Sequence, residues 1–295
     1  MDRTEFCGCK GMRTCFICEE KYNLTPTVDS SRLKDLICVS YCSYCNLLWE
    51  GWNINECKNL PSHTGKSYNF DGIYIEHEFI DLKEEANLIE NLDQIPWDVS
   101  QSGRRKQNFG PKCNFKKRRL SIGNFNGFPL CTKFVQDRFK QLSIMKDYHT
   151  IEQCSLEYNP KKGASIDPHV DDCWIWGERI VTLNLLTDSV LTLTPHNIKY
   201  KNQYNIEYIP NSQCTLLSGS KKKYPFDVIR IPMPRRSLLV LYGNTRYLWE
   251  HCVLREDIQD RRICVAYREF TPPYLKGGLY FKDSCDIIER AKIFW

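Results

Sequence analysis

Short hydrophobic segments rich in Val, Ile, Leu and Tyr dominate the chain beyond residue 150, and turn residues separate them at short intervals. These segments are IEQCSLEYNP, RIVTLNLL, SVLTLTP, DVIRIPMP, RSLLVLYG and RRICVAYREF. Upstream, FDGIYIEHEFI alternates hydrophobic and polar residues and predicts a strand with Ile73 and Ile75 facing inward. Strand-forming segments at this spacing predict a β-sandwich or barrel rather than parallel βαβ units.

Two segments predict helices that flank the strands. Asp81 with Glu84 three residues later resembles a capping box, so the first helix starts there and ends before Pro96. The second is expected near 130–145. Their apolar stripes consist of Leu82, Ile89 and Leu92 in the first helix and of Val135, Phe139 and Leu142 in the second. The fold class predicted is therefore mainly β with flanking helices.

Two polar stretches interrupt this pattern. The segment QSGRRKQNFGPKCNFKKRRL, between the two helices, is rich in Gly, Arg and Lys and predicts an irregular basic connection. The segment from about 196 to 227 has few hydrophobic residues and predicts a long hairpin or an insertion. The formal net charge of the whole chain is only +5, which does not by itself indicate a nucleic-acid binder.

Composition also constrains the cellular setting of this 295-residue chain. No stretch of about 18 apolar residues is present, so no membrane span is predicted. The first twenty residues, MDRTEFCGCKGMRTCFICEE, lack the apolar core of a signal peptide. Sixteen cysteines without such a signal favour reduced thiols and metal binding over disulfides. We therefore expect a protein of the cytoplasm and nucleus, and a monomer.

Eight of the sixteen cysteines lie within the first 57 residues. The first four form the pattern C-x-C-x5-C-x2-C and are Cys7, Cys9, Cys15 and Cys18. Glycines at 8 and 11 permit the tight turns by which four sulfur atoms converge, so the pattern predicts a closed zinc site. An iron–sulfur cluster and a set of free thiols on a flexible arm are the alternatives. A second, weaker candidate site consists of Cys38, Cys42, Cys45 and Cys57.

The segment IDPHVDDCWIWGERIVTLNLL places His169 and Asp171 two residues apart, on one face of an extended chain. His251 lies in RYLWEHCVL, beyond an expected turn at Gly243 and Asn244. Two histidines and a carboxylate on the strands of a β-barrel are typical of non-haem Fe(II) oxygenases. An H-x-D pair alone is common, and a zinc hydrolase could use the same three ligands.

The last β-prone segment, RRICVAYREF, places Arg262 and Arg268 six residues apart, on one face of a strand. Buried guanidinium groups need anions, and a dicarboxylate such as 2-oxoglutarate supplies them. The alternative for Arg268 is a surface ion pair with Glu269 or Glu250.

These segments together resemble the AlkB family of Fe(II)- and 2-oxoglutarate-dependent dioxygenases. The resemblance rests on HVD, WGERIVTLNLL, RSLLVLYGNTRYLWEH and RRICVAYRE, and it covers roughly residues 70 to 272. The leader CGCKGMRTCFICE and the segment PWDVSQSGRRKQNFGPKCNF resemble one animal subfamily. The resemblance implies a double-stranded β-helix (jelly-roll) core over 70–285, preceded by a cysteine-rich arm over 1–69.

The same resemblance implies the roles of individual residues. His169, Asp171 and His251 match the iron ligands, and Arg262 matches the arginine that holds the distal carboxylate of 2-oxoglutarate. Arg268 matches the second arginine that contacts the cosubstrate, and Tyr158 in EYNP matches its tyrosine hydrogen-bond donor. Leu156 stands where the family often has Asn, so that contact is not carried over. No catalytic residue is expected beyond the metal ligands.

The implied reaction uses O2 and 2-oxoglutarate to remove an N-methyl group, with release of formaldehyde and succinate. The implied substrates are methyl-lysine in a protein such as actin, or N6-methyladenine in DNA. The basic connection with Phe109 and Phe115 suits DNA, whereas Asp172, Trp174, Trp176 and Glu178 suit a methylated ammonium, although tryptophans there are more often core residues. The sequence does not choose between them. A non-catalytic scaffold protein that keeps the fold is the alternative function.

Overall fold

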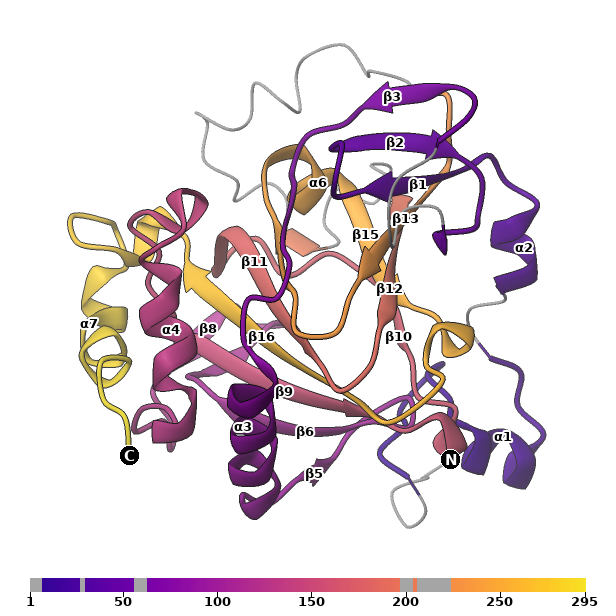
Figure 1. Ribbon diagram of the computed structural model, residues 1–295. Coiled ribbons are helices and arrows are strands. Elements are labelled where there is room, and N and C mark those ends of the chain that lie inside the picture. The colour runs from indigo at the N-terminus through magenta and orange to yellow at the C-terminus, as the bar shows by residue number, and fades with distance from the viewer. Residues whose placement is uncertain (1–6, 27–29, 56–62, 197–203, 206–223) are drawn as a thin grey trace.

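The computed structural model describes residues 7–26, 30–55, 63–196, 204–205 and 224–295. Cys57 and most of the insertion predicted at 196–227 lie outside the described residues. Two seven-stranded sheets face each other, and helices lie outside one of them (Figure 1). This is the double-stranded β-helix core that the family resemblance implied.

The first sheet has the strand order β10-β15-β12-β13-β1-β2-β3. Its strands are β1 (Cys38–Cys42), β2 (Leu47–Glu50), β3 (Ser67–Asn69), β10 (Ile166–His169), β12 (Ser189–Pro195), β13 (Val228–Met233) and β15 (Trp249–Val253). Only one of its neighbouring pairs, β1 with β13, is parallel. Three strands from the predicted N-terminal arm thus continue the sheet that carries β10 and β15.

The second sheet has the order β4-β14-β11-β16-β9-β6-β5. Its strands are β4 (Ile73–Glu76), β5 (Asp98–Val99), β6 (Arg105–Phe109), β9 (Glu152–Tyr158), β11 (Trp176–Leu185), β14 (Leu238–Leu241) and β16 (Arg262–Phe270). A separate hairpin joins β7 (Lys112–Asn114) to β8 (Arg119–Ser121). The helices are α1 (Phe16–Tyr22), α2 (Ser30–Lys34), α3 (Leu82–Gln94), α4 (Lys133–Phe139), α6 (Gly243–Leu248) and α7 (Phe281–Arg290).

Side-chain alternation explains why the second sheet is buried on both faces. Along β11, Ile180 packs into the core between the sheets, whereas Val181 packs beneath α3 and α4. Leu88 of α3 and Phe139 of α4 belong to this second core. A strand covered on both faces must be hydrophobic at nearly every position, which is why RIVTLNLL lacks strict alternation.

The first predicted helix is confirmed, together with its capping box: Asp81 accepts from the backbone amide of Glu84, whose side chain accepts from that of Asp81. Leu82 was wrongly placed in its apolar stripe, because it is 58% exposed. The second helix is shorter than predicted, since α4 is flanked by single 3-10 turns at 130–132 and 143–145.

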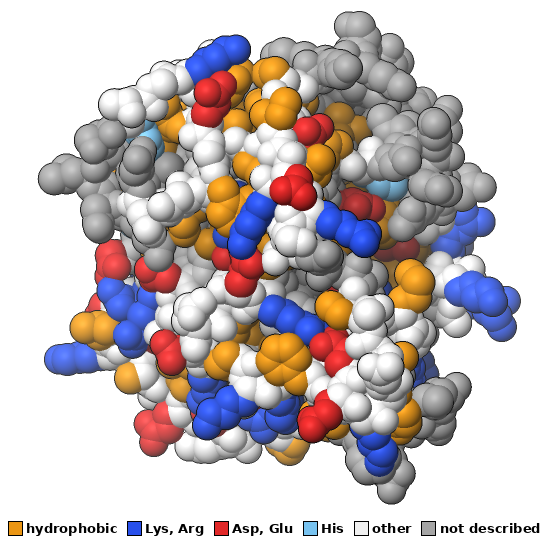
Figure 2. Space-filling model, turned by 90° about the vertical axis from the view of Figure 1, so that its right-hand side faces the viewer, with side chains coloured by type: hydrophobic (Ala, Val, Ile, Leu, Met, Phe, Trp, Pro, Cys, Tyr) orange, Lys and Arg blue, Asp and Glu red, His pale blue; other side chains and the backbone are white. Residues whose placement is uncertain are grey.

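Two further predictions were wrong. The basic segment is not an irregular connection, because it contains β6, β7 and the start of β8, and β6 pairs with β9 along five residues. The turn expected at Gly243 and Asn244 is the start of α6, which leads directly into β15. Within the described residues, no helix is long and apolar enough to cross a membrane. On the face drawn in Figure 2, basic and acidic side chains lie intermingled, in keeping with the small net charge.

Candidate active site

The two predicted histidine ligands face each other across a strand pair. His169 is the last residue of β10 and is paired in register with His251 of β15, and their ring centres are 4.2 Å apart. Asp171 follows two residues after the end of β10, beyond the regular strand. Ligand atoms of all three residues lie within 4.8 Å of one another, close enough to share one metal ion.

Hydrogen bonds orient the first histidine and the carboxylate toward that shared point. His169 Nδ1 lies 2.9 Å from the carbonyl oxygen of Asp167, a contact that requires the proton on Nδ1 and leaves Nε2 as the ligand atom. Asp171 Oδ1 accepts a hydrogen bond from Arg268 Nε at 2.8 Å. Its buried Oδ2 accepts none from any residue that the structure describes and lies 3.7 Å from His251 Nε2. A buried carboxylate oxygen without a donor fits a metal ligand.

The electrostatic environment favours the protonation states that bind a metal. Burial lowers the pKa of His251 to about 3, assisted by the nearby His169, and burial lowers the pKa of His169 as well. Burial raises the pKa of Asp171, but Arg268 and the two histidines outweigh it, so the pKa lies well below its ordinary value. At neutral pH the site therefore presents two neutral imidazoles and one carboxylate.

Arg262 is buried beside the predicted cosubstrate tyrosine. It pairs in register with Tyr158 across β16 and β9, and its guanidinium carbon lies 4.8 Å from the centre of the tyrosine ring. Arg262 Nε donates to Asn184 Oδ1 at 2.7 Å, whereas the buried Nη1 has no hydrogen-bond partner among the described residues. A guanidinium that is 1% exposed and incompletely paired fits a missing anion such as a carboxylate.

Arg268 lies on the same side of β16 as Arg262, as their six-residue separation predicted, and it contacts the carboxylate of Asp171. Besides Asp171, it donates to Glu152 at 2.6 Å, its partner in register on β9. The surface pair with Glu269 does not occur, because Glu269 instead holds Arg179.

Sequence reasoning missed Glu152 and Asn184. Asn184 is the one amide in RIVTLNLL, and a polar residue inside an apolar strand is the signal that could have identified it. Glu152 had no comparable signal, because its role depends on pairing with a strand more than a hundred residues away.

A cavity of about 760 Å³ opens beside His169 and Arg268. Its other described lining residues are Cys7, Gly8, Lys10, Arg13, Val99, Ser100, Gln101, Arg104, Lys106, Phe115, Cys154, Leu156, Ile166 and Asp167. The lining thus combines the N-terminal segment with the basic segment. Trp174 and Trp176 are buried in the core, which confirms the interpretation of these tryptophans as core residues.

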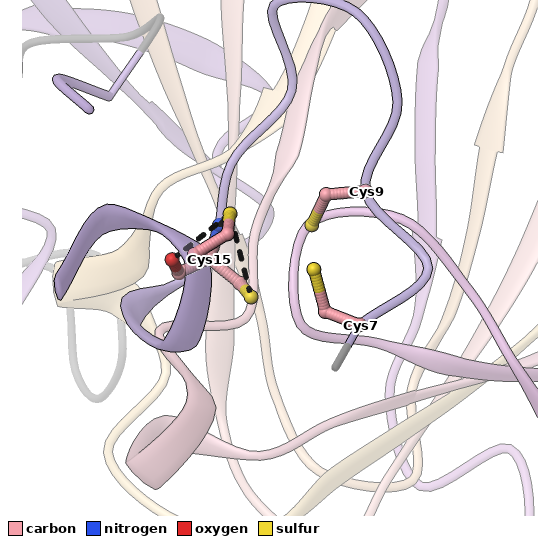
Figure 3. A group of neighbouring side chains, drawn as sticks. Cys7, Cys9 and Cys15 are labelled. Atoms are coloured by element: carbon pink, nitrogen blue, oxygen red, sulfur yellow. Dashed lines mark hydrogen bonds between the residues drawn. The ribbon is translucent and has the colours of Figure 1, made fainter. Parts of the chain in front are cut away.

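The four N-terminal cysteines also converge. All are buried, each offers a sulfur atom within 4.8 Å of the others, and none forms a disulfide. Figure 3 shows the sulfur atoms of Cys7 and Cys9 turned toward each other, near Cys15 at the start of α1. In the second group, Cys42 and Cys45 meet His63 rather than Cys38, whose thiol donates to backbone carbonyl oxygens at 33 and 36.

Two histidines on paired strands of a double-stranded β-helix, with an aspartate just beyond one of those strands, define the class of non-haem Fe(II) oxygenases. The comparisons with known proteins agree. The chain is 35% identical over 294 residues to the Alpha-ketoglutarate-dependent dioxygenase alkB homolog 4 of Mus musculus, covering 98% of this chain and 94% of the relative. It is 37% identical to the human protein of that name over 278 residues, covering 92% and 88%.

A third relative, the DNA N6-methyl adenine demethylase of Caenorhabditis elegans, is 30% identical over 303 residues, covering 97% of this chain and 94% of the relative. No family model matches the sequence. With relatives this similar along nearly its whole length, the chain belongs to the AlkB family of Fe(II)- and 2-oxoglutarate-dependent dioxygenases.

Proposed function

We propose that this dioxygenase removes N-methyl groups from a macromolecule, and that His169, Asp171 and His251 hold its iron. The observation that carries the proposal is the convergence of these three ligands, together with the buried, incompletely paired guanidinium of Arg262 on the strand whose Arg268 contacts Asp171. Arg262, with Tyr158 beside it, would hold the distal carboxylate of 2-oxoglutarate. Iron, 2-oxoglutarate and O2 supply the oxidation that converts the N-methyl group to formaldehyde, with succinate and CO2 as coproducts.

The protein's own contribution is orientation and the exclusion of water. Arg268 holds Asp171 through Nε, and Glu152 in turn neutralises Arg268. Arg262 is buried between the two sheets among hydrophobic residues, which would exclude water from the distal end of the cosubstrate.

Of the two implied substrate classes, the cavity favours DNA with N6-methyladenine. Besides Arg268, which is paired with Asp171 and Glu152, four cations line it, Lys10, Arg13, Arg104 and Lys106, against Asp167 as the one carboxylate among the described lining residues. A methyl-lysine would bring a further positive charge, whereas a methylated adenine is neutral and flanked by phosphates that these cations attract. Phe115, 47% exposed, offers a surface on which an unpaired base stacks.

The test compares two substrates under one set of conditions. Protein with Fe(II), 2-oxoglutarate and O2 is given single-stranded DNA with N6-methyladenine, or a methyl-lysine peptide of the actin type, and formaldehyde and succinate are measured. We expect product from the DNA and at least a tenfold loss of turnover in His251→Ala and Arg262→Ala. Turnover of the peptide alone would reject the DNA assignment, and product from neither substrate would reject N-demethylation.

We also propose that Cys7, Cys9, Cys15 and Cys18 hold a structural zinc ion. The sulfur atoms of Cys15 and Cys18 are 3.9 Å apart. An ion bound tetrahedrally at about 2.3 Å from each sulfur separates the sulfurs by about 3.8 Å, whereas a disulfide requires about 2.05 Å. Four ligands leave no open position, which favours a structural ion over a catalytic one. Metal analysis of protein purified without chelators should find zinc that remains when iron is removed.

A further inference from the structure

The cysteine loop, residues 7–18, is part of the wall of the active-site cavity. Cys7, Gly8, Lys10 and Arg13 line the same cavity as His169, although more than 150 residues of sequence separate them from it. The four cysteines therefore lie directly behind a surface that a substrate would touch. A metal ion among them would fix the positions of Lys10 and Arg13.

Close contacts attach this loop to residues 100–102, which precede β6. The backbone amide of Ser102 donates to Cys9 Sγ at 3.2 Å, and Arg13 Nη1 donates to Gln101 Oε1 at 2.6 Å. Gly8 packs so closely that a Cβ atom added to it would lie 2.5 Å from the carbonyl oxygen of Ser100. These contacts fix the loop against the residues that lead into β6, the strand that carries Lys106.

The loop has too little hydrophobic core to hold that position unaided. Its buried hydrophobic cluster consists of the four cysteines, with Tyr22 and Leu24 packed against them. A cluster of this size does not order a segment by itself, and the loop's other anchors are polar contacts such as that of Arg255 with Thr14, so metal binding would add substantially to its order. Iron and 2-oxoglutarate, in contrast, are held by residues of β9, β10, β15 and β16 and by Asp171, none of which belongs to the loop.

From this division we propose that zinc in the cysteine loop builds the substrate-binding wall, so that zinc controls turnover of the macromolecular substrate without controlling the binding of iron and 2-oxoglutarate. The inference rests on the proposed zinc site and the proposed demethylation. Losing zinc would release Lys10 and Arg13, two of the five cations that line the cavity.

The experiment compares Cys9→Ser with Gly8→Ala in the full chain. Cys9→Ser removes a zinc ligand, whereas Gly8→Ala keeps all four thiols and displaces the loop from Ser100. Cys285→Ser, a thiol of α7 outside the cluster, is the matched control. Four quantities are measured: zinc content, formation of the anaerobic Fe(II)–2-oxoglutarate complex, hydrogen exchange of residues 99–106, and demethylation.

We expect Cys9→Ser to lose one zinc per chain, Gly8→Ala to keep it, and both to exchange faster at the Ser102 amide. Both should form the Fe(II)–2-oxoglutarate complex like wild type and lose at least tenfold in kcat/KM for methylated DNA. Zinc-free Cys9→Ser with wild-type exchange at 99–106 overturns the inference even if no substrate is turned over. Absence of turnover by wild type, with the exchange difference present, overturns only the proposed demethylation.

Cys42, Cys45 and His63 form a second group of possible metal ligands, separate from the cysteine loop. Cys42 ends β1 and Cys45 lies in the turn before β2, so C-x2-C forms the tip of a hairpin, a common arrangement for two zinc ligands. A ligand atom of His63 lies within 4.8 Å of both sulfurs. The His63 ring stacks on Trp49 of β2, with ring centres 4.4 Å apart and planes at 13°.

We infer that Cys42, Cys45 and His63 supply three of the four ligands of a second zinc ion, which clamps the β1–β2 hairpin to the chain that leads into β3. These strands form the end of the first sheet opposite β10, so this ion does not touch the active site. Its loss should therefore lower stability rather than activity.

Zinc stoichiometry decides the matter. Wild type should hold two zinc ions per chain, Cys42→Ser one, and the double variant Cys9→Ser with Cys42→Ser none. Cobalt-substituted Cys9→Ser, which keeps only the second site, should still show a thiolate-to-cobalt absorption band that Cys42→Ser with Cys9→Ser lacks. One zinc in wild type that Cys42→Ser retains in full would reject the second site.

Discussion

Arg268 Nε donates a 2.8 Å hydrogen bond to Oδ1 of Asp171, so the second arginine of β16 directly orients the carboxylate that we propose as a metal ligand. Its guanidinium is also anchored on Glu152, which fixes both its position and its charge. Arg268 lines the cavity as well, where it can meet the iron-chelating end of 2-oxoglutarate. In the proposed site, one side chain would thereby link the metal ligand to the cosubstrate.

Arg268→Lys should accordingly weaken metal binding. A lysine keeps the positive charge but cannot contact Asp171 and Glu152 simultaneously through a planar fork, so the carboxylate loses its orientation. We expect a loss in Fe(II) or Mn(II) affinity of about tenfold, measured by anaerobic titration.

Arg179→Lys is the matched control, because Arg179 is also anchored on a glutamate, Glu269, but lies away from the ligands. An equal loss of metal affinity in the two variants would show that the effect of Arg268→Lys is a general one of destabilisation.

Tyr158→Phe tests the cosubstrate pocket. Tyr158 is fully buried against Arg262, and removing its hydroxyl should raise KM for 2-oxoglutarate by about tenfold, the effect of one lost hydrogen bond to a charged group. Metal affinity should not change. Steady-state kinetics with varied 2-oxoglutarate measure the change.

Tyr267→Phe is the control for this variant. Tyr267 is equally buried, but it packs in the other core, beneath α4, and its hydroxyl has no hydrogen-bond partner among the described residues. Its removal should leave KM unchanged. A similar rise in both variants would refute a specific role for Tyr158.

The sequence identified the residues whose chemistry is local and missed those whose role depends on distant pairing. His169 and Asp171 are two residues apart, so their spacing alone predicted that they lie close together. Arg262 and Arg268 share one strand, so their spacing predicted that they lie on the same side of it. The basic segment was mistaken for an irregular connection because its charges indicated solvent exposure. In the fold, Arg105 is paired with Glu157, 52 residues away, so the strand tolerates its charge.

The remaining cations of that segment should act on DNA. Lys106 lines the cavity, and replacing it by alanine should weaken binding of single-stranded DNA and reduce the slope of log affinity against log salt by about one phosphate contact, roughly 0.7. Fluorescence anisotropy at several salt concentrations measures both. Lys140→Ala removes an exposed cation of the helical side, paired with Asp137, and should change neither. An unchanged salt slope in Lys106→Ala would exclude this residue from the DNA contact.

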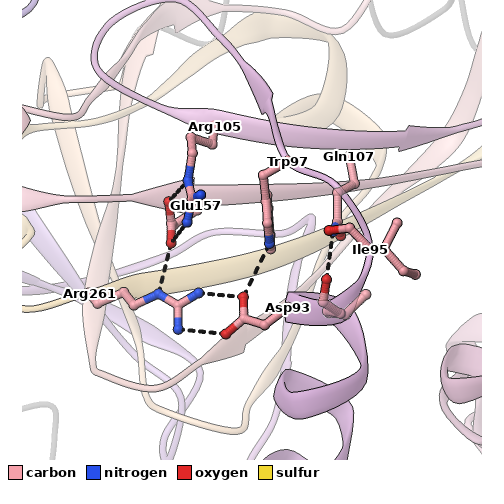
Figure 4. A network of polar contacts seen from close by, with 8 residues as sticks. Asp93, Ile95, Trp97, Arg105, Gln107, Glu157 and Arg261 are labelled. Atoms are coloured by element: carbon pink, nitrogen blue, oxygen red, sulfur yellow. Dashed lines mark hydrogen bonds and ion pairs between the residues drawn. The ribbon is translucent and has the colours of Figure 1, made fainter.

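A network of ion pairs joins the second sheet to α3 (Figure 4), and it should make the free energy of unfolding depend on pH. Glu157 holds both Arg105 and Arg261, and Arg261 also holds Asp93 at the end of α3. Burial raises the pKa of Glu157, but the two arginines outweigh it, so the pKa in the fold lies below its ordinary value. The hydrogen bonds from Arg261 likewise lower the pKa of Asp93.

Because both folded pKa values are lowered, the fold favours the ionised carboxylates. Their stabilisation is complete above the unfolded pKa values, about 4.3 for Glu and 3.9 for Asp, and is lost as the pH falls through the folded values. Glu157→Gln should therefore lower the free energy of unfolding at pH 7, and its deficit should shrink as the pH falls below about 4. Urea unfolding between pH 7 and pH 3 measures this convergence.

Glu90→Gln changes an exposed residue of α3 and should follow wild type throughout. A deficit for Glu157→Gln that stays constant down to pH 3 would show that packing, rather than ionisation, is what the carboxylate provides.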